Sequence, residues 1–116
     1  MTDPKATILL VDDKANFREG IKKMLTRDGY AVTDVTSGEE ASKLMGEDPT
    51  RYEFALIDQV LHPGKKAGRK EGPWDGIETA QELMRINKDI CTIIYSGIEE
   101  HKNEALRKGV HRFIYR

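Results

Sequence analysis

The sequence predicts an α/β fold, a parallel β-sheet with helices on both faces, and two observations support this. First, five short apolar runs alternate along the chain with amphipathic segments, at residues 7–11, 31–35, 54–57, 91–95 and 112–115. Second, the first, third and fourth runs are almost continuously apolar, as in strands covered on both faces, whereas the second and fifth contain polar residues typical of edge strands. Alternating strands and helices favour a parallel sheet joined by right-handed crossovers.

The segments between the runs have helical periodicity. Apolar residues recur three and four positions apart, so each segment presents one apolar stripe to the sheet. The clearest stripes are Phe17, Ile21, Met24 and Leu25; Ala41, Leu44 and Met45; and Ile77, Ala80 and Met84.

Helix boundaries are also visible in the sequence. The stretches 37–40 and 75–78 have the spacing of a capping box, in which a small polar residue and a glutamate three positions later satisfy free backbone N–H groups. Gly29 and Gly109 stand where a helix is expected to stop, since glycine adopts the left-handed conformation that ends many helices.

Length and composition indicate one small globular domain over residues 1–116. Hydrophobic residues make up 38% of the chain and charged residues 34%, and the formal net charge is −1. This balance does not favour direct binding to nucleic acid or to an anionic membrane. The chain has no apolar run near the roughly 18 residues of a membrane helix and no signal peptide, so we expect a cytoplasmic protein.

One segment interrupts the alternation. Residues 62–74 read HPGKKAGRKEGPW and form a basic loop rich in glycine and proline, which is long for so compact a domain. It is interpreted as a solvated loop anchored by Trp74, and alternatively as a docking element in which basic side chains meet an acidic partner. The histidines His62, His101 and His111 have no spacing typical of metal ligands.

Acidic residues follow two of the predicted buried strands. Asp12 and Asp13 come directly after the first run, and Asp58 comes directly after the third. If these strands are neighbours, three carboxylates converge, and a hard divalent cation such as Mg²⁺ would relieve their mutual repulsion. In the alternative, Asp13 caps a helix and Asp58 lies elsewhere on the surface.

Five separated motifs, in this order, resemble the receiver domains of bacterial response regulators, the CheY-like modules of two-component signalling. They are ILLVDD at residues 8–13, the strand that leads to Asp58, Asp-Gly-Ile-Glu at 75–78, Tyr-Ser-Gly at 95–97 and Gly-Val-His-Arg-Phe-Ile at 109–114. The resemblance covers essentially the whole chain. It implies a flavodoxin-like, doubly wound sheet in the order 2-1-3-4-5.

The resemblance also implies a chemistry. Asp58 would accept a phosphoryl group from a sensor histidine kinase or a phosphotransfer protein, and Ser96 would contact that group. Mg²⁺ would be bound by Asp13, Asp58 and the carbonyl oxygen of Val60, with Asp12 acting through water. The module would switch an output and would not be an enzyme.

The chain departs from the family pattern at its end. Arg116 stands where the family has a lysine, and arginine does not simply replace a compact ammonium group. The helix that usually closes the fold is absent from this sequence, and a longer protein could continue beyond Arg116; if the helix is truly missing, the apolar face that it covers would be exposed and would favour a homodimer or poor solubility. Two alternatives remain: a pseudo-receiver that acts as a phosphorylation-independent interaction domain, and a small flavodoxin-like enzyme or nucleotide-binding domain.

Overall fold

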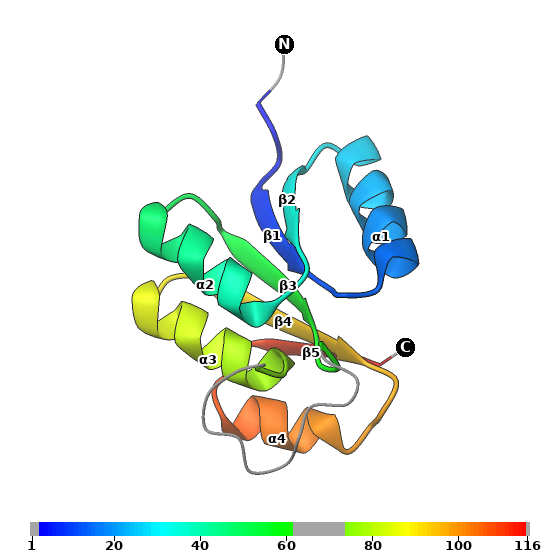
Figure 1. The fold of residues 1–116 in the computed structure, drawn as a ribbon, viewed down its shortest axis with the longest axis vertical. Coiled ribbons are helices and arrows are strands. Elements are labelled where there is room, and N and C mark those ends of the chain that lie inside the picture. The colour runs from blue at the N-terminus through cyan, green and yellow to red at the C-terminus, as the bar shows by residue number, and fades with distance from the viewer. Residues whose placement is uncertain (1–2, 62–73, 116) are drawn as a thin grey trace.

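Five parallel strands form one sheet in the order β2-β1-β3-β4-β5, as the resemblance implies. The computed structural model describes residues 3–61 and 74–115. The elements along the chain are β1 (Thr7–Val11), α1 (Ala15–Arg27), β2 (Ala31–Val35), α2 (Gly38–Glu47), β3 (Phe54–Asp58), α3 (Gly76–Ile86), β4 (Cys91–Ser96), α4 (His101–Arg107) and β5 (Arg112–Tyr115). Figure 1 shows α1 on one side of the sheet and α2 and α3 side by side on the other.

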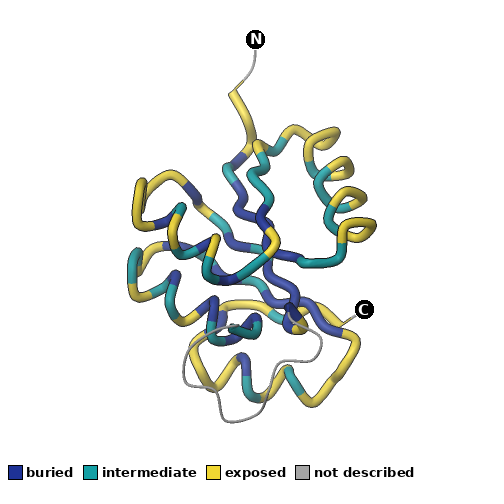
Figure 2. Tube along the Cα trace, in the orientation of Figure 1, coloured by how far each residue is buried: buried dark blue, intermediate teal, exposed yellow. Residues whose placement is uncertain are grey.

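The main core lies between the sheet and the helices α2, α3 and α4. Alternate residues of the central strands, such as Leu9, Ile57 and Ile94, point into it and are fully buried. The predicted stripes of α2 and α3 supply the other side, with Ala41, Met45 and Ala80 fully buried. The dark central strands in Figure 2 correspond to this layer.

The opposite face of the sheet is covered less completely. Phe17 and Met24, from the predicted stripe of α1, remain 51% and 48% exposed. Beside α1 lies an apolar groove of about 270 Å³, lined by Ile8, Leu25, Tyr30, Phe54, Leu56, Ile93 and Ile114. The periodicity of α1 is therefore correct, but part of its stripe faces this open region.

The predicted helix boundaries are largely confirmed. Asp75 and Glu78 form a complete capping box at the start of α3, and Gly29 and Gly109 follow α1 and α4 with φ angles of 100° and 95°. At α2 only half of the box forms: Ser37 accepts from the N–H of Glu40, whereas the Glu40 carboxylate accepts from the N–H of Thr36. Among the described residues, none of the helices has the length and hydrophobicity that a membrane span requires.

A pair of cations fastens α1 to the sheet. Arg18 and Lys22 donate to the carboxylate of Asp34 on β2 at 3.1 and 2.8 Å. Arg18 also donates to the carbonyl oxygen of Asp12, at 3.0 Å. The hydrogen bond from Lys22 is the main reason that the pKa of Asp34 lies below its ordinary value.

Asp34→Asn is expected to lower the free energy of unfolding by about 1 kcal/mol at pH 7, because it removes the charge that both cations bind. Because the pKa of Asp34 is lower in the folded state, its ionised carboxylate stabilises the fold at pH values above the ordinary pKa of 3.8. This stabilisation is lost as the pH falls through the pKa that Asp34 has in the folded state. Urea denaturation at pH 7 and pH 3 should therefore show a difference from wild type that shrinks in acid. Asp89→Asn, at an exposed site away from α1, serves as the control. An equal loss of unfolding free energy in Asp89→Asn would contradict a stabilising role for the ion pairs of Asp34.

Candidate metal and phosphoryl-acceptor site

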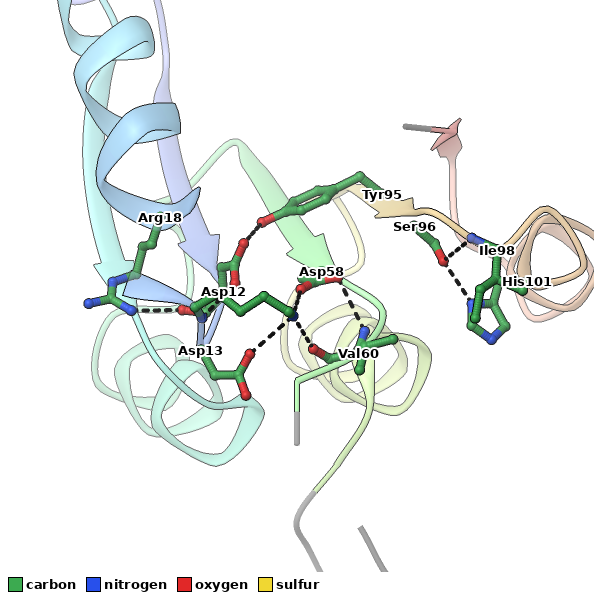
Figure 3. Close-up of polar contacts among 10 residues, drawn as sticks. Asp12, Asp13, Arg18, Asp58, Val60, Tyr95, Ser96, Ile98 and His101 are labelled. Carbon is green, nitrogen blue, oxygen red and sulfur yellow. Dashed lines mark hydrogen bonds and ion pairs between the residues drawn. The ribbon is translucent and has the colours of Figure 1, made fainter. Parts of the chain in front are cut away.

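The parallel pairing of β1 with β3 brings the predicted acidic residues together. Val11 pairs with Ile57, so Asp12 and Asp13 leave the sheet beside Asp58, the last residue of β3. One oxygen of each carboxylate lies within 4.8 Å of the others (Figure 3). The alternative in which Asp13 caps the first helix is wrong, since the N-cap residue of α1 is Lys14.

The three carboxylates differ in burial and in partners. Asp12 is fully buried and accepts hydrogen bonds from the Tyr95 hydroxyl at 2.5 Å and from the backbone N–H of Lys14 at 2.8 Å. Asp58 is 1% exposed and accepts from the backbone N–H of Val60 at 3.2 Å. The side chain of Asp13 is 20% exposed. The cluster is thus buried and hydrogen-bonded at Asp12 and open to solvent at Asp13.

The ammonium group of Lys14 lies inside this cluster. It donates to Asp58 Oδ2 at 2.6 Å, to the carbonyl oxygen of Val60 at 2.9 Å and to Asp13 Oδ1 at 3.4 Å. One cation among three carboxylates leaves the cluster with an excess of negative charge. Sequence reasoning missed this residue, although its position directly after two aspartates was a signal.

Burial and charge within the cluster both shift pKa values. Burial, aided by the charge of Asp12, raises the pKa of Asp58 above its ordinary value even though Lys14 and Val60 donate to it. Burial lowers the pKa of Lys14, but its hydrogen bond to Asp58 and the charges of the three aspartates outweigh this and raise it. Both groups thus hold a proton more tightly, as expected where a further positive charge is favourable.

The oxygen atoms of this cluster fit Mg²⁺. Three carboxylates and the Val60 carbonyl are hard oxygen donors, which Mg²⁺ prefers, and an ammonium group already bridges three of these residues. The structure thus brings together all four residues predicted as metal ligands: Asp12, Asp13, Asp58 and Val60.

The acceptor strand is held by the start of α3. The backbone N–H of Gly76 donates to the carbonyl oxygen of Gln59 at 3.0 Å, and that of Ile77 donates to the Gln59 side chain at 2.8 Å. A Cβ atom on Gly76 would stand 2.5 Å from the carbonyl oxygen of Asp58. The close contact needs a residue without a side chain, and it fixes the backbone at Asp58.

Comparison with known families identifies the chain. The model of the response regulator receiver domain matches residues 8–116. The protein belongs to this family. It is therefore the receiver domain of a two-component response regulator, as the five motifs indicated.

The receiver domain is related to regulators from bacteria and plants. It is 29% identical over 90% of its length to the transcriptional regulatory protein ComA of Bacillus subtilis, of which the match covers 46%. It is 34% identical over 80% of its length to the two-component response regulator ORR27 of Oryza sativa subsp. japonica, of which 13% is covered. The chain thus spans less than half the length of these relatives.

Solved structures share the fold. CheY in the CheX-CheY-BeF3-Mg+2 complex from Borrelia burgdorferi superposes with a TM-score of 0.79, at 23% identity, over 97% of this chain and 79% of that chain. The Francisella response regulator 1452 receiver domain gives 0.77 at 24% identity, over 97% of this chain and 84% of that chain. At these identities the likeness concerns the fold alone.

Ser96, the predicted phosphoryl contact, is the last residue of β4, and its hydroxyl oxygen is engaged by α4 and the preceding turn. It lies 2.8 Å from Nδ1 of His101 and accepts from the N–H of Ile98 at 3.0 Å. Figure 3 shows this side chain pointing toward His101, away from Asp58. Contact with a phosphoryl group would require a rotation that breaks these bonds. The sequence offered no sign of the His101 contact, since the two residues lie in different elements.

Two predicted features lie outside the described residues. One is Arg116, and the other is most of the basic segment 62–74, which includes His62. Trp74 at its end is described: it is half-buried, and its backbone N–H donates to the carboxylate of Glu39 at 3.2 Å.

Proposed function

We propose that this receiver domain accepts a phosphoryl group on Asp58 in a Mg²⁺-dependent reaction and thereby switches an output. The observation that carries the proposal is the position of the Asp58 carboxylate, buried at the end of β3 and within 4.8 Å of two further carboxylates. The complete acidic cluster gives no support to the phosphorylation-independent alternative. The nucleotide-binding alternative lacks the glycine-rich loop expected after the first strand; two aspartates stand there instead and would repel a phosphate unless a metal intervened.

The proposed step is a substitution at phosphorus. An oxygen of Asp58 attacks the phosphorus atom of a phosphohistidine, the P–N bond breaks, and the imidazole leaves with its electron pair and takes up a proton. Bound Mg²⁺ would offset the negative charge on the transferring group. Asp13, Asp58 and the Val60 carbonyl would hold the ion directly, and the buried Asp12 would orient its water ligands.

The remaining parts of the proposal concern the response and the partners. Ser96 would exchange its bond to His101 for one to a phosphoryl oxygen, and Arg116 would provide the basic group that the family has as lysine. The donor would be a sensor histidine kinase or a phosphotransfer protein in the cytoplasm. The domain would act as a switch modified once per signalling cycle, not as an enzyme that turns over a separate substrate.

The apolar groove beside α1 would offer a surface on which a second copy of the chain could pack to form a homodimer.

The test is phosphorylation by acetyl phosphate, which needs no partner protein. With Mg²⁺, wild type should gain one base-labile phosphoryl group by intact mass, and chelation of Mg²⁺ should prevent this. Asp58→Asn keeps the shape of the side chain and removes the nucleophile, so its labelling should be lost, whereas the control Asp89→Asn should label as wild type does. Equal labelling of Asp58→Asn and wild type would place the acceptor elsewhere.

A further inference from the structure

Lys14 contacts the same three groups that were predicted to bind Mg²⁺ directly. Its ammonium nitrogen lies 2.6 Å from Asp58 Oδ2, 2.9 Å from the carbonyl oxygen of Val60 and 3.4 Å from Asp13 Oδ1. A cation bound to these oxygens directly and this ammonium group cannot occupy the same position. Lys14 is therefore arranged as an alternative occupant of the cation position.

The local structure explains why the side chain reaches this point. Lys14 is the N-cap residue of α1, and its backbone N–H is fixed by Asp12 Oδ1 at 2.8 Å. The aspartate is itself held by the Tyr95 hydroxyl, so the base of the lysine side chain is anchored to a buried group. The side chain nevertheless remains 33% exposed. It thus has a path to solvent if another cation takes its place.

Lysine suits such an exchange. Its compact ammonium group offers three donors, and its four-carbon stem rotates freely, so the charge can leave without any backbone movement. The next two basic side chains along the chain, Arg18 and Lys22, bind Asp34 on β2. Of these three basic side chains, Lys14 is therefore the one that binds the carboxylates of the cluster.

We propose that Lys14 is a built-in competitor of the divalent cation, which stabilises the acidic cluster until Mg²⁺ displaces it from Asp58. This inference rests on the proposed function, because it assumes that Mg²⁺ binds at the cluster. It adds that Mg²⁺ takes the place of the ammonium group at Asp58 Oδ2, which now accepts a 2.6 Å hydrogen bond, so that metal binding and release of the Lys14 side chain are one event. It also implies that Lys14 weakens the apparent affinity for Mg²⁺.

The test compares Lys14→Met with Lys22→Met by Mg²⁺ titration, followed through backbone amide shifts around Asp13 and Val60. Both variants lose one lysine of α1 that binds an aspartate, but only Lys14 lies at the cluster. Lys14→Met should bind Mg²⁺ about tenfold more tightly than wild type, the equivalent of one charge-assisted hydrogen bond that no longer has to be broken. The affinity of Lys22→Met should change by less than about twofold, since Lys22 contacts the more distant Asp34.

Thermal unfolding supplies a second readout. Without divalent cations, Lys14→Met should melt below wild type, and its melting temperature should rise more steeply with added Mg²⁺. If Lys14→Met does not remain folded without Mg²⁺, Lys14→Gln keeps a hydrogen-bond donor without the charge and should show the same tightening of Mg²⁺ affinity.

The outcomes separate the two proposals. If wild type binds Mg²⁺ at the cluster and neither Lys14 variant binds it more tightly, Lys14 is not a competitor, while the proposed function stands. If neither wild type nor the Lys14 variants show site-localised shifts with Mg²⁺, the metal site itself is wrong, and the role of Lys14 falls with it.

Discussion

Gly76→Ala is expected to lower the free energy of unfolding by about 3 kcal/mol, an overpacking cost at the upper end of the usual range. The added Cβ atom would stand 2.5 Å from the carbonyl oxygen of Asp58 and 2.7 Å from the Cα atom of Gln59. Both of these are backbone atoms, so no side chain can rotate to make room. The start of α3 must move away from β3, which strains the two hydrogen bonds to Gln59.

Urea denaturation of Gly76→Ala and Gly20→Ala tests this expectation. Gly20 lies within α1 and has no atom within 4 Å of an added Cβ, so alanine there should stabilise the protein by about 0.5–1 kcal/mol. Opposite signs for the two variants would support the close contact at Gly76. Unchanged stability of Gly76→Ala would show that α3 and β3 can separate easily. Any folded Gly76→Ala should also label more slowly with acetyl phosphate, because the displaced backbone carries Asp58.

Asp13→Asn is expected to weaken Mg²⁺ binding by about 100-fold, since even outer-shell changes at metal sites cost about 10–100-fold. The fold should survive, because the side chain is 20% exposed and its contact with Lys14 is long, at 3.4 Å. Loss of one of three neighbouring negative charges also removes repulsion. Without divalent cations the variant should therefore be at least as stable as wild type.

Amide shifts and thermal unfolding during a Mg²⁺ titration measure both effects, with Asp89→Asn as the control. The expected changes in Mg²⁺ affinity for Asp13→Asn and Lys14→Met have opposite signs, so the pair distinguishes a metal ligand from a competitor of the metal. Wild-type affinity in Asp13→Asn would remove this residue from the ligand set.

The sequence by itself was sufficient for most of the strands and helices, because their signals are local, whereas the strand order followed from the resemblance to receiver domains. Apolar runs identified the five described strands, and helical stripes identified α1, α2 and α3, whereas α4 was indicated only by Gly109 at its end. Polar residues in 31–35 and 112–115 identified the edge strands. The strand ends were slightly misjudged: Asp58 and Ser96 belong to β3 and β4, because their backbones continue the pairing with the neighbouring strands. The acidic cluster was predictable too, since neighbouring parallel strands end at the same edge of a sheet.

Only the tertiary structure showed which hydrogen-bond partners the side chains of the site have. Lys14 and Asp58 are 44 positions apart, and Tyr95 and Asp12 are 83 apart, so no local pattern indicates either hydrogen bond. Ser96 and His101 are close in sequence, yet their contact depends on how the turn after β4 places α4. The sequence also did not show that the capping box at Ser37 forms only in part, because the Glu40 carboxylate accepts from the N–H of Thr36 and not from that of Ser37. The arrangement of the backbone follows from the periodic pattern of apolar residues along the chain. The hydrogen bonds of the acidic cluster and of Ser96 depend on side-chain positions that are defined only once the sheet has assembled.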